Sequence, residues 1–261
     1  MINSWRNLCL DNISFTSADN FTHSFPDHFH EEYTIGVSVK GIQKFEIQGK
    51  SLVVEPYSIF LIQPHLLHAH YPIADLGWSF KSLYLHTDFI KHLLKDTAMK
   101  RMSDDPIVIQ NRPLFKQYIR IHANKLMPDE ALLADFVRQL SSKVIQTNKD
   151  IDSGLPEKME AIKQHLYEQF NQKLGLENLA KIYHTDKYQL IRQFKQHIGV
   201  TPNTYLTILR IEKARKMINN GYPIVDAALE AGFYDQSHFH RSFLYYTGVT
   251  PGNFNRHQAD L

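Results

Sequence analysis

The sequence has few of the features that mark secreted, membrane-spanning or disordered proteins. Among its 261 residues is a single cysteine, Cys9, which excludes an internal disulfide. No apolar run approaches the roughly 18 residues of a membrane span, and the first ten residues lack the basic and apolar regions of a secretory signal. Because 43% of the residues are hydrophobic, the chain can bury a core in one or two domains. We therefore expect a soluble, reduced, cytoplasmic protein with no membrane partner.

Motifs of common catalytic chemistry are also missing. The chain has no glycine-rich phosphate loop, no nucleophile elbow and no Cys-x-x-Cys pair. Its adjacent carboxylates, at 31–32 and 104–105, are typical of a solvated surface. We therefore predict a protein that is not an enzyme, with no catalytic residue and no cofactor.

Charge is nearly balanced, with a formal net charge of +2. Residues 157–261 contain 13 Lys and Arg and 10 Asp and Glu, whereas residues 1–156 contain 16 and 17. If either part binds phosphate, the C-terminal part is favoured. Its excess of positive charge is nevertheless far below that of a strongly basic nucleic-acid-binding domain.

Residues 1–86 have the pattern of an all-β domain. Turn residues recur about every eight to twelve residues, which predicts a barrel or sandwich. The predicted strands are 33–39, 43–48, 51–55, 59–62 and 78–85. In residues 87–145 the apolar period becomes helical. Its two stripes are Phe89, Ile90, Leu93 and Leu94, and then Leu132, Leu133, Phe136, Leu140 and Val144. These helices either pack on the β domain or form a homodimer surface, and the polar segment 146–156 is predicted as a linker.

From residue 157 the whole pattern is helical, and one unit occurs twice, at about 176–197 and 224–246. Four residue pairs repeat at a spacing of 49: Leu190 with Phe239, Arg192 with Arg241, Phe194 with Phe243, and Gly199 with Gly248. Asp186 and Asp235 are predicted to cap the second helix of each copy. A short helix, a turn and a capped helix predict a helix-turn-helix, so the chain has two. A long helix at about 203–219 separates them.

Several segments carry a family resemblance. They are 176–180 (Leu-Glu-Asn-Leu-Ala), 190–202, 210–214 (Arg-Ile-Glu-Lys-Ala), 231–243 (Ala-Gly-Phe-Tyr-Asp-Gln-Ser-His-Phe-His-Arg-Ser-Phe) and 247–251 (Thr-Gly-Val-Thr-Pro). At this spacing, residues 157–256 resemble the DNA-binding domain of the AraC/XylS family of bacterial transcription regulators. The resemblance implies binding to double-stranded DNA, and contact with RNA polymerase if the protein is an activator. Leu244 and Asn255 depart from the family, which usually has basic residues there.

The inward pairs decide which side chains can face DNA. With Leu190 and Phe194 turned inward, the first unit presents Lys187, Tyr188, Ile191 and Arg192. The second unit presents Gln236, Ser237, His240 and Arg241. Arginine can bridge guanine, and glutamine or serine can bond several base edges. Because successive major grooves lie ~34 Å apart, one chain can read two of them. The alternative for each position is an ordinary solvated helix surface.

The N-terminal part shows a looser resemblance. Segment 28–36 (His-Phe-His-Glu-Glu-Tyr-Thr-Ile-Gly), Gly41 and segment 59–68 resemble the cupin-type effector-binding domain joined to many AraC-family regulators. A small β-barrel can enclose one small molecule. The candidate effector-binding residues are His28, His30, Tyr33, Phe45 and His68. The expected class is thus α+β and multidomain: a cupin-like barrel with flanking helices and an all-α, effector-controlled DNA-binding domain.

A second function remains open for the histidines. His-x-His on a strand places both imidazoles on one face, so His28, His30 and His68 could bind a metal ion. The protein would then be a metal-dependent cupin enzyme with an appended helical domain. Metal cupins, however, have a glutamate four or five residues after the second histidine, where this chain has Thr34 and Ile35. We therefore expect the three histidines to bind effector without a metal, and the nearby residues 65 and 70, also histidines, to lie in loops.

Overall fold

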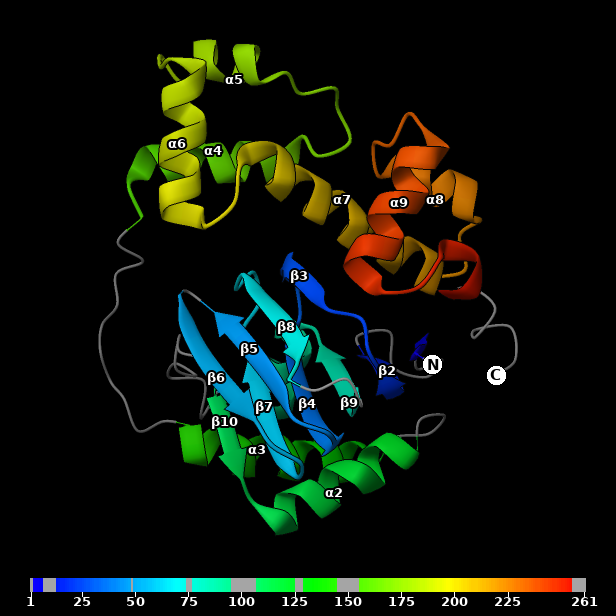
Figure 1. The fold of residues 1–261 in the computed structure, drawn as a ribbon. Coiled ribbons are helices and arrows are strands. Elements are labelled where there is room, and N and C mark those ends of the chain that lie inside the picture. The colour runs from blue at the N-terminus through cyan, green and yellow to red at the C-terminus, as the bar shows by residue number, and fades with distance from the viewer. Residues whose placement is uncertain are drawn as a thin grey trace. The chain divides into compact units, whose positions relative to one another are not determined.

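The structure is a computed structural model that describes residues 2–6, 13–47, 49–73, 77–94, 107–124, 129–144 and 155–254. The chain divides into two compact units, one mainly of strands and one mainly of helices (Figure 1). The boundary lies near residue 150, except that residues 26–29 belong to the helical unit. The predicted linker, 146–156, lies outside the described residues up to position 154.

The strands form two antiparallel sheets. The six-stranded sheet has the order β1 (Ile2–Arg6), β2 (Ile13–Phe21), β9 (Trp78–Leu85), β4 (Tyr33–Lys40), β7 (Ser58–Ile62) and β10 (Ile107–Gln110). The four-stranded sheet has the order β3 (Phe25–His28), β8 (His68–Pro72), β5 (Gln43–Ile47) and β6 (Lys50–Val54). In the described part of the chain no ladder joins the sheets. The predicted barrel is therefore a pair of packed sheets that is not closed.

The two faces of the six-stranded sheet differ in chemistry. On β4, Ile35 and Val37 belong to the main apolar cluster, whereas Thr34, Gly36 and Ser38 alternate with them and so lie on the opposite face. Cross-strand register extends this second face with Thr16, Phe60, Phe80, Ser82 and Tyr84. It packs toward the four-stranded sheet, because the rings of Phe60 and Phe45 lie 4.9 Å apart.

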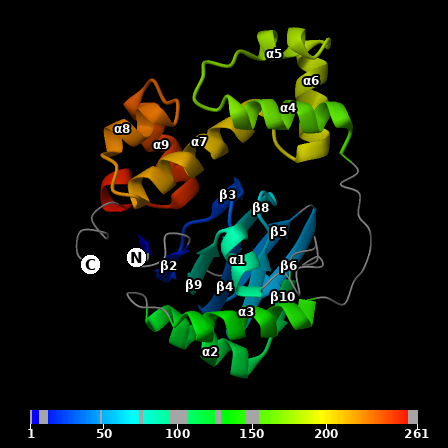
Figure 2. The same cartoon turned by 180° about the vertical axis from the view of Figure 1, so that it is seen from behind.

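Three helices cover the apolar face: α1 (Thr87–Leu94), α2 (Arg112–Ala123) and α3 (Glu130–Val144) (Figures 1 and 2). Tyr118 of α2 anchors this layer, because its buried hydroxyl donates to the carbonyl oxygens of Ile35 (2.8 Å) and Lys81 (3.1 Å). Burial raises the pKa of Tyr118 well above its ordinary value, since the phenolate would lose its hydration.

The predicted helical stripes lie in this core, so packing on the sheet explains them. Those seen buried are Phe89, Ile90, Leu93, Leu133, Phe136 and Leu140, whereas the side chains of Leu94 and Val144 are outside the described residues. Helix α2 was not predicted. Its N-terminal signals are local: Asn111 accepts a hydrogen bond from the backbone of Leu114 (3.0 Å), and Pro113 lies in the first turn.

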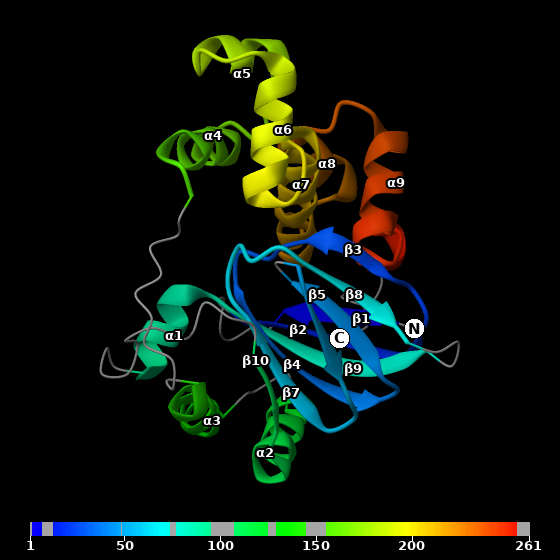
Figure 3. The ribbon, with the colours of Figure 1, turned by 60° about the vertical axis from the view of Figure 1, so that its left-hand side comes forward.

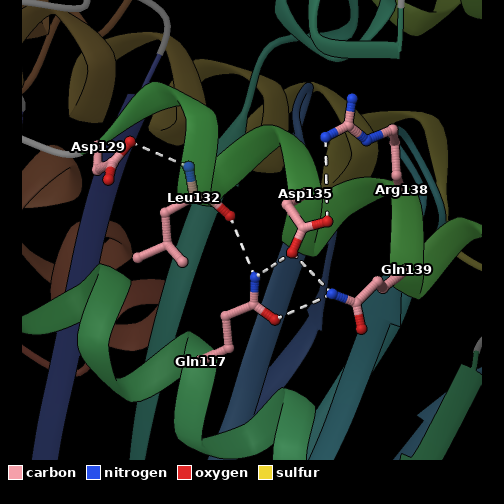
Figure 4. A network of polar contacts seen from close by, with 6 residues as sticks. All are labelled: Gln117, Asp129, Leu132, Asp135, Arg138 and Gln139. Carbon is pink, nitrogen blue, oxygen red and sulfur yellow. Dashed lines mark hydrogen bonds and ion pairs between the residues drawn. The ribbon is translucent and has the colours of Figure 1, made fainter.

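A polar network joins the outer surfaces of α2 and α3 (Figure 4). The Gln117 amide donates to the Leu132 carbonyl (3.3 Å) and to the Asp135 carboxylate (3.0 Å). The Gln139 amide donates to the same carboxylate at 2.7 Å, and Arg138 is 3.9 Å from its other oxygen. These bonds fix the spacing of the two helices above the buried stripe.

The second unit contains the helices α4 (Glu157–Glu168), α5 (Leu176–Ile182), α6 (Lys187–Ile198), α7 (Pro202–Asn219), α8 (Ile224–Glu230) and α9 (Gln236–Thr247). Helix α7 contacts α4 and α6 as well as α8 and α9 (Figure 3). It therefore connects two smaller helical groups. The long helix predicted at about 203–219 is confirmed, with its start one residue earlier.

Candidate nucleic-acid interface and ligand site

The first helix-turn-helix consists of α5 and α6. Asp186 caps α6 as predicted, because its carboxylate accepts hydrogen bonds from the backbone of Tyr188 (2.8 Å) and Gln189 (3.2 Å). Leu190 and Phe194 are fully buried and form the predicted inward pair. Gly199 ends the helix in the left-handed conformation.

The opposite face of α6 is open to solvent. Tyr188 is 75% exposed, and Arg192, one turn along, is also exposed. Lys187 and Ile191 are half-buried at the edges of this face, and the Lys187 ammonium pairs with Glu177 at 3.2 Å. Of the four predicted DNA-facing residues, Tyr188 and Arg192 therefore lie most fully outward.

The second helix-turn-helix consists of α8 and α9. Asp235 caps α9 through the backbone N–H of Ser237 (2.9 Å), and Phe239 and Phe243 are buried as predicted. Gly248 ends the helix in the left-handed conformation. All four predicted DNA-facing residues are exposed: Gln236, Ser237, His240 and Arg241.

Both open faces extend one turn beyond the predicted residues. Lys195 is exposed three residues after Arg192, and Leu244, at the equivalent position of α9, is 44% exposed. The helical period was the signal for both positions, because residues three and four apart share a face. The faces thus match in shape and differ in charge.

Arg210 of α7 and Tyr234, which lies in the turn of the second helix-turn-helix, both donate hydrogen bonds to the turn after α4. The Arg210 guanidinium donates to the carbonyl oxygens of Phe170 (2.7 Å) and Gln172 (2.8 Å). Burial lowers the pKa of Arg210, with a smaller opposing effect from Tyr234. The Tyr234 hydroxyl donates to the carbonyl of Asn171 in the same turn (3.3 Å). The turn after α4 therefore contacts both α7 and the turn between α8 and α9.

Four of the five predicted effector residues are buried; three of them belong to the first unit, and His28 lies in residues 26–29, which belong to the second. His28, His30, Phe45 and His68 are each less than a tenth exposed. Tyr33 differs, because alternation along β4 places it on the helix-covered face, where it packs against the apolar cluster. Tyr33 lies in the segment 28–36 that carries the family resemblance, whereas the two-residue period of β4 places it on the face opposite Thr34.

Two further buried residues belong to the same interior. Gln43 lies two residues before Phe45 on β5, and Trp78 packs beside His70, with ring centroids 5.8 Å apart. Both are about 1% exposed. The Gln43 amide nitrogen and the Trp78 indole nitrogen have no hydrogen-bond acceptor among the described residues. Because burying an unsatisfied N–H is costly, each marks a position where a ligand oxygen can bind.

Known proteins match both units. Residues 12–140 match the AraC-like ligand binding domain, and residues 179–257 match a helix-turn-helix domain. The transcriptional activator RhaS of Enterobacter sp. (strain 638) is 31% identical over 235 residues, 84% of each chain. The transcriptional regulator YbfI of Bacillus subtilis (strain 168) is 26% identical, covering 91% of this chain and 90% of its own.

Solved structures show the same fold. ToxT from Vibrio cholerae O395 superposes with a TM-score of 0.66 at 15% identity and covers 100% of this chain and 98% of its own. Another ToxT structure, with a TM-score of 0.63 and 16% identity, contains a bound unsaturated fatty acid; it covers 100% of this chain and 96% of that one.

A ligand-binding domain followed by two helix-turn-helix units defines a DNA-binding transcription regulator. The chain belongs to the AraC/XylS family of these regulators. It is therefore not an enzyme, and the alternative of a metal-dependent cupin enzyme is wrong. Among the described helices, none has the length and apolar character needed to cross a membrane.

Proposed function

We propose that the regulator reads two successive major grooves, with α6 in one and α9 in the next. The observation that carries this proposal is the pair of equivalent open faces, with Tyr188 and Arg192 on one and Ser237 and Arg241 on the other. Each face lies opposite a fully buried pair and begins at a capped N-terminus, where a recognition helix meets base edges.

The test is to select duplexes from a random pool with the full chain and to measure affinity by fluorescence anisotropy across a salt series. A selected site with two half-sites about 10–10.5 base pairs apart, bound with a negative salt slope, is expected. A single half-site, or no enrichment at all, would contradict the two-groove proposal.

We further propose that the interior of the first unit binds a small amphipathic effector. His30, Phe45 and His68 supply its walls, and the N–H groups of Gln43 and Trp78 would bond acceptor oxygens of the ligand. A carboxylate on an apolar body has this chemistry, and the fatty acid in ToxT is one example. Effector binding would then bias the DNA-binding units.

Tryptophan fluorescence tests this proposal directly, because Trp78 lies in the interior. A carboxylate effector should quench or shift the Trp78 emission in a saturable way, and Gln43→Leu should weaken its binding by removing a hydrogen-bond donor to the ligand. Saturable binding that Gln43→Leu leaves unchanged would place the ligand elsewhere.

We also propose that residues 87–145 form a homodimer through the outer surface of α2 and α3, where Asp135 and Arg138 are about half exposed. Sedimentation of the chain and of Asp135→Arg would test this, since the variant disrupts the polar network of that surface. We also propose contact with RNA polymerase, as expected of an activator such as RhaS, and a cytoplasmic location.

A further inference from the structure

The inner face of the six-stranded sheet has a buried hydroxyl that the proposed effector contacts do not use. Thr34 lies on β4 and is 3% exposed, and its hydroxyl has no hydrogen-bond partner among the described residues. Cross-strand register places Thr34 opposite Tyr84 of β9, on the face that packs toward the four-stranded sheet. Burying a hydroxyl without a partner is costly, so Thr34 marks a position where a polar group of a ligand can bind.

Gln43 and Trp78 lie at the other end of the same interior. Trp78 begins β9, and Tyr84, the cross-strand partner of Thr34, lies six residues further along the same face. Gln43 belongs to the Trp78 end, because a Cβ added at Gly41, two residues before it, would lie 2.9 Å from Trp78 Cα. At ~3.4 Å per residue, the backbone between the two ends spans ~20 Å.

The middle of this interior is mainly aromatic. The ring of Phe45 lies 4.9 Å from that of Phe60 and 4.0 Å from that of His70. His70 pairs with Phe45 across β8 and β5, so the prediction that His70 lies in a loop is wrong, whereas His65 does lie in a turn. The interior therefore has polar groups at its two ends and aromatic rings between them.

We propose that the effector has an oxygen group at each end, a carboxylate bound by Gln43 and Trp78 and a hydroxyl bound by Thr34. This inference rests on the effector site proposed above and adds the chemistry of its far end. A threonine hydroxyl both donates and accepts, so a ligand hydroxyl can pair with it in either sense. A hydrogen bond of ~3 Å at each end leaves about 14 Å for the ligand, and extended ω-hydroxydodecanoic acid has a length of that order.

The far end can be tested by the order of two affinities. If the surroundings of Thr34 acted as a purely apolar site, a buried ligand hydroxyl would lose its water and bind more weakly than a methyl group. If Thr34 bonds the ligand hydroxyl, that hydroxyl is paired, whereas a methyl-ended acid leaves the Thr34 hydroxyl unsatisfied. The two cases predict opposite orders.

Calorimetric titration of the full chain with dodecanoic acid and with ω-hydroxydodecanoic acid, both below their micelle concentrations, measures this order. We expect the hydroxy acid to bind about tenfold more tightly, the upper range for one neutral hydrogen bond. Thr34→Val removes the hydroxyl at nearly constant volume and should reverse the order. Gln43→Leu should weaken the binding of both acids alike, because both carry the carboxylate.

Ser141→Ala is the matched control. Ser141 is 1% exposed, and its hydroxyl also has no partner in the described part of the chain, but it lies on α3, on the other face of the six-stranded sheet. This variant should keep the preference for the hydroxy acid. Thermal unfolding without ligand checks folding, and Thr34→Val should be at least as stable as the unmodified chain, because it removes an unsatisfied buried group.

Tighter binding of dodecanoic acid by the unmodified chain would overturn the proposal. A preference for the hydroxy acid that a folded Thr34→Val variant keeps, or that Ser141→Ala loses, would overturn it as well. In each of these cases, saturable binding that Gln43→Leu weakens would leave the proposed effector site intact. Saturable binding of neither acid would contradict both proposals.

Discussion

The two helix-turn-helix units share a frame but differ in charge. Each has an aspartate cap, a buried pair four residues apart and a left-handed glycine at the end of its second helix. Helix α6, however, carries three cations, Lys187, Arg192 and Lys195, whereas the only lysine or arginine of α9 is Arg241. Non-specific affinity for DNA comes mainly from neutralised phosphates, so the first helix-turn-helix should supply most of this affinity.

The turns of the two units also differ. The turn of the first has four residues, 183–186, and that of the second has five, 231–235. The longer turn brings Gly232 against the chain after α4, where an added Cβ would lie 2.8 Å from Asn171 Cα and 3.0 Å from the Phe170 carbonyl oxygen. The second helix-turn-helix is thus held against the chain after α4 by backbone packing.

The largest expected effect is that of Gly232→Ala, which breaks this packing. Gly232 has a φ of +87°, and left-handed backbone costs ~1–2 kcal/mol, to which overpacking adds ~1–3 kcal/mol. We expect the helical unit to lose about 2–5 kcal/mol in urea unfolding followed by circular dichroism. Gly221→Ala is the matched control, because its φ is +84° with nothing within 4 Å, and it should show the backbone cost alone. Equal losses in the two variants would contradict the packing argument.

Removing either arginine should weaken specific binding next most strongly. A bidentate contact with guanine contributes ~1–3 kcal/mol, so Arg192→Ala and Arg241→Ala should each lose that much on the selected duplex. Arg241→Ala should lose specificity at its half-site and little non-specific affinity. Anisotropy on selected and scrambled duplexes measures both quantities. An Arg241→Ala loss that is the same on both duplexes would show a phosphate contact instead.

Removing the caps should have a smaller effect that differs between the units. A cap lost to alanine costs ~1 kcal/mol. Asp186 accepts from two backbone N–H groups and Asp235 from one, so Asp186→Ala should destabilise the chain more than Asp235→Ala. Thermal unfolding of the two variants compares them, and the reverse order would show that the two caps are not ranked by their hydrogen bonds.

The sequence predicted the helical unit much better than the strand unit. Caps, inward pairs and glycine stops are local signals, and each occurs in both copies of the repeat. The structure confirms the two caps, Asp186 and Asp235, for example. The pairing of β8 with β5 depends on contacts between distant segments, so the place of His70 opposite Phe45 could not be predicted from spacing. Strands β1, β2, β3, β8 and β10 and helix α2 were missed for a related reason, since elements with weak periodicity are defined by the sheet in which they pair or on which they pack.

The smallest expected effect tests the charge comparison itself. Leu244 occupies in α9 the position that Lys195 occupies in α6, 49 residues earlier, and both side chains are exposed. If these positions face phosphate, Leu244→Lys should steepen the plot of log affinity against log salt by about 0.9, and Lys195→Leu should flatten it by the same amount. Anisotropy with a scrambled duplex measures both slopes.

The paired substitution is informative because it restores the total charge. A chain with both Lys195→Leu and Leu244→Lys has the net charge of the original chain, so any remaining difference in affinity depends on where the charge lies. If the slope returns to the original value, the two helices contact phosphate equivalently. If only Lys195→Leu changes the slope, α9 is held away from the backbone at Leu244, and that side chain is then free to contact an apolar base surface such as the thymine methyl group.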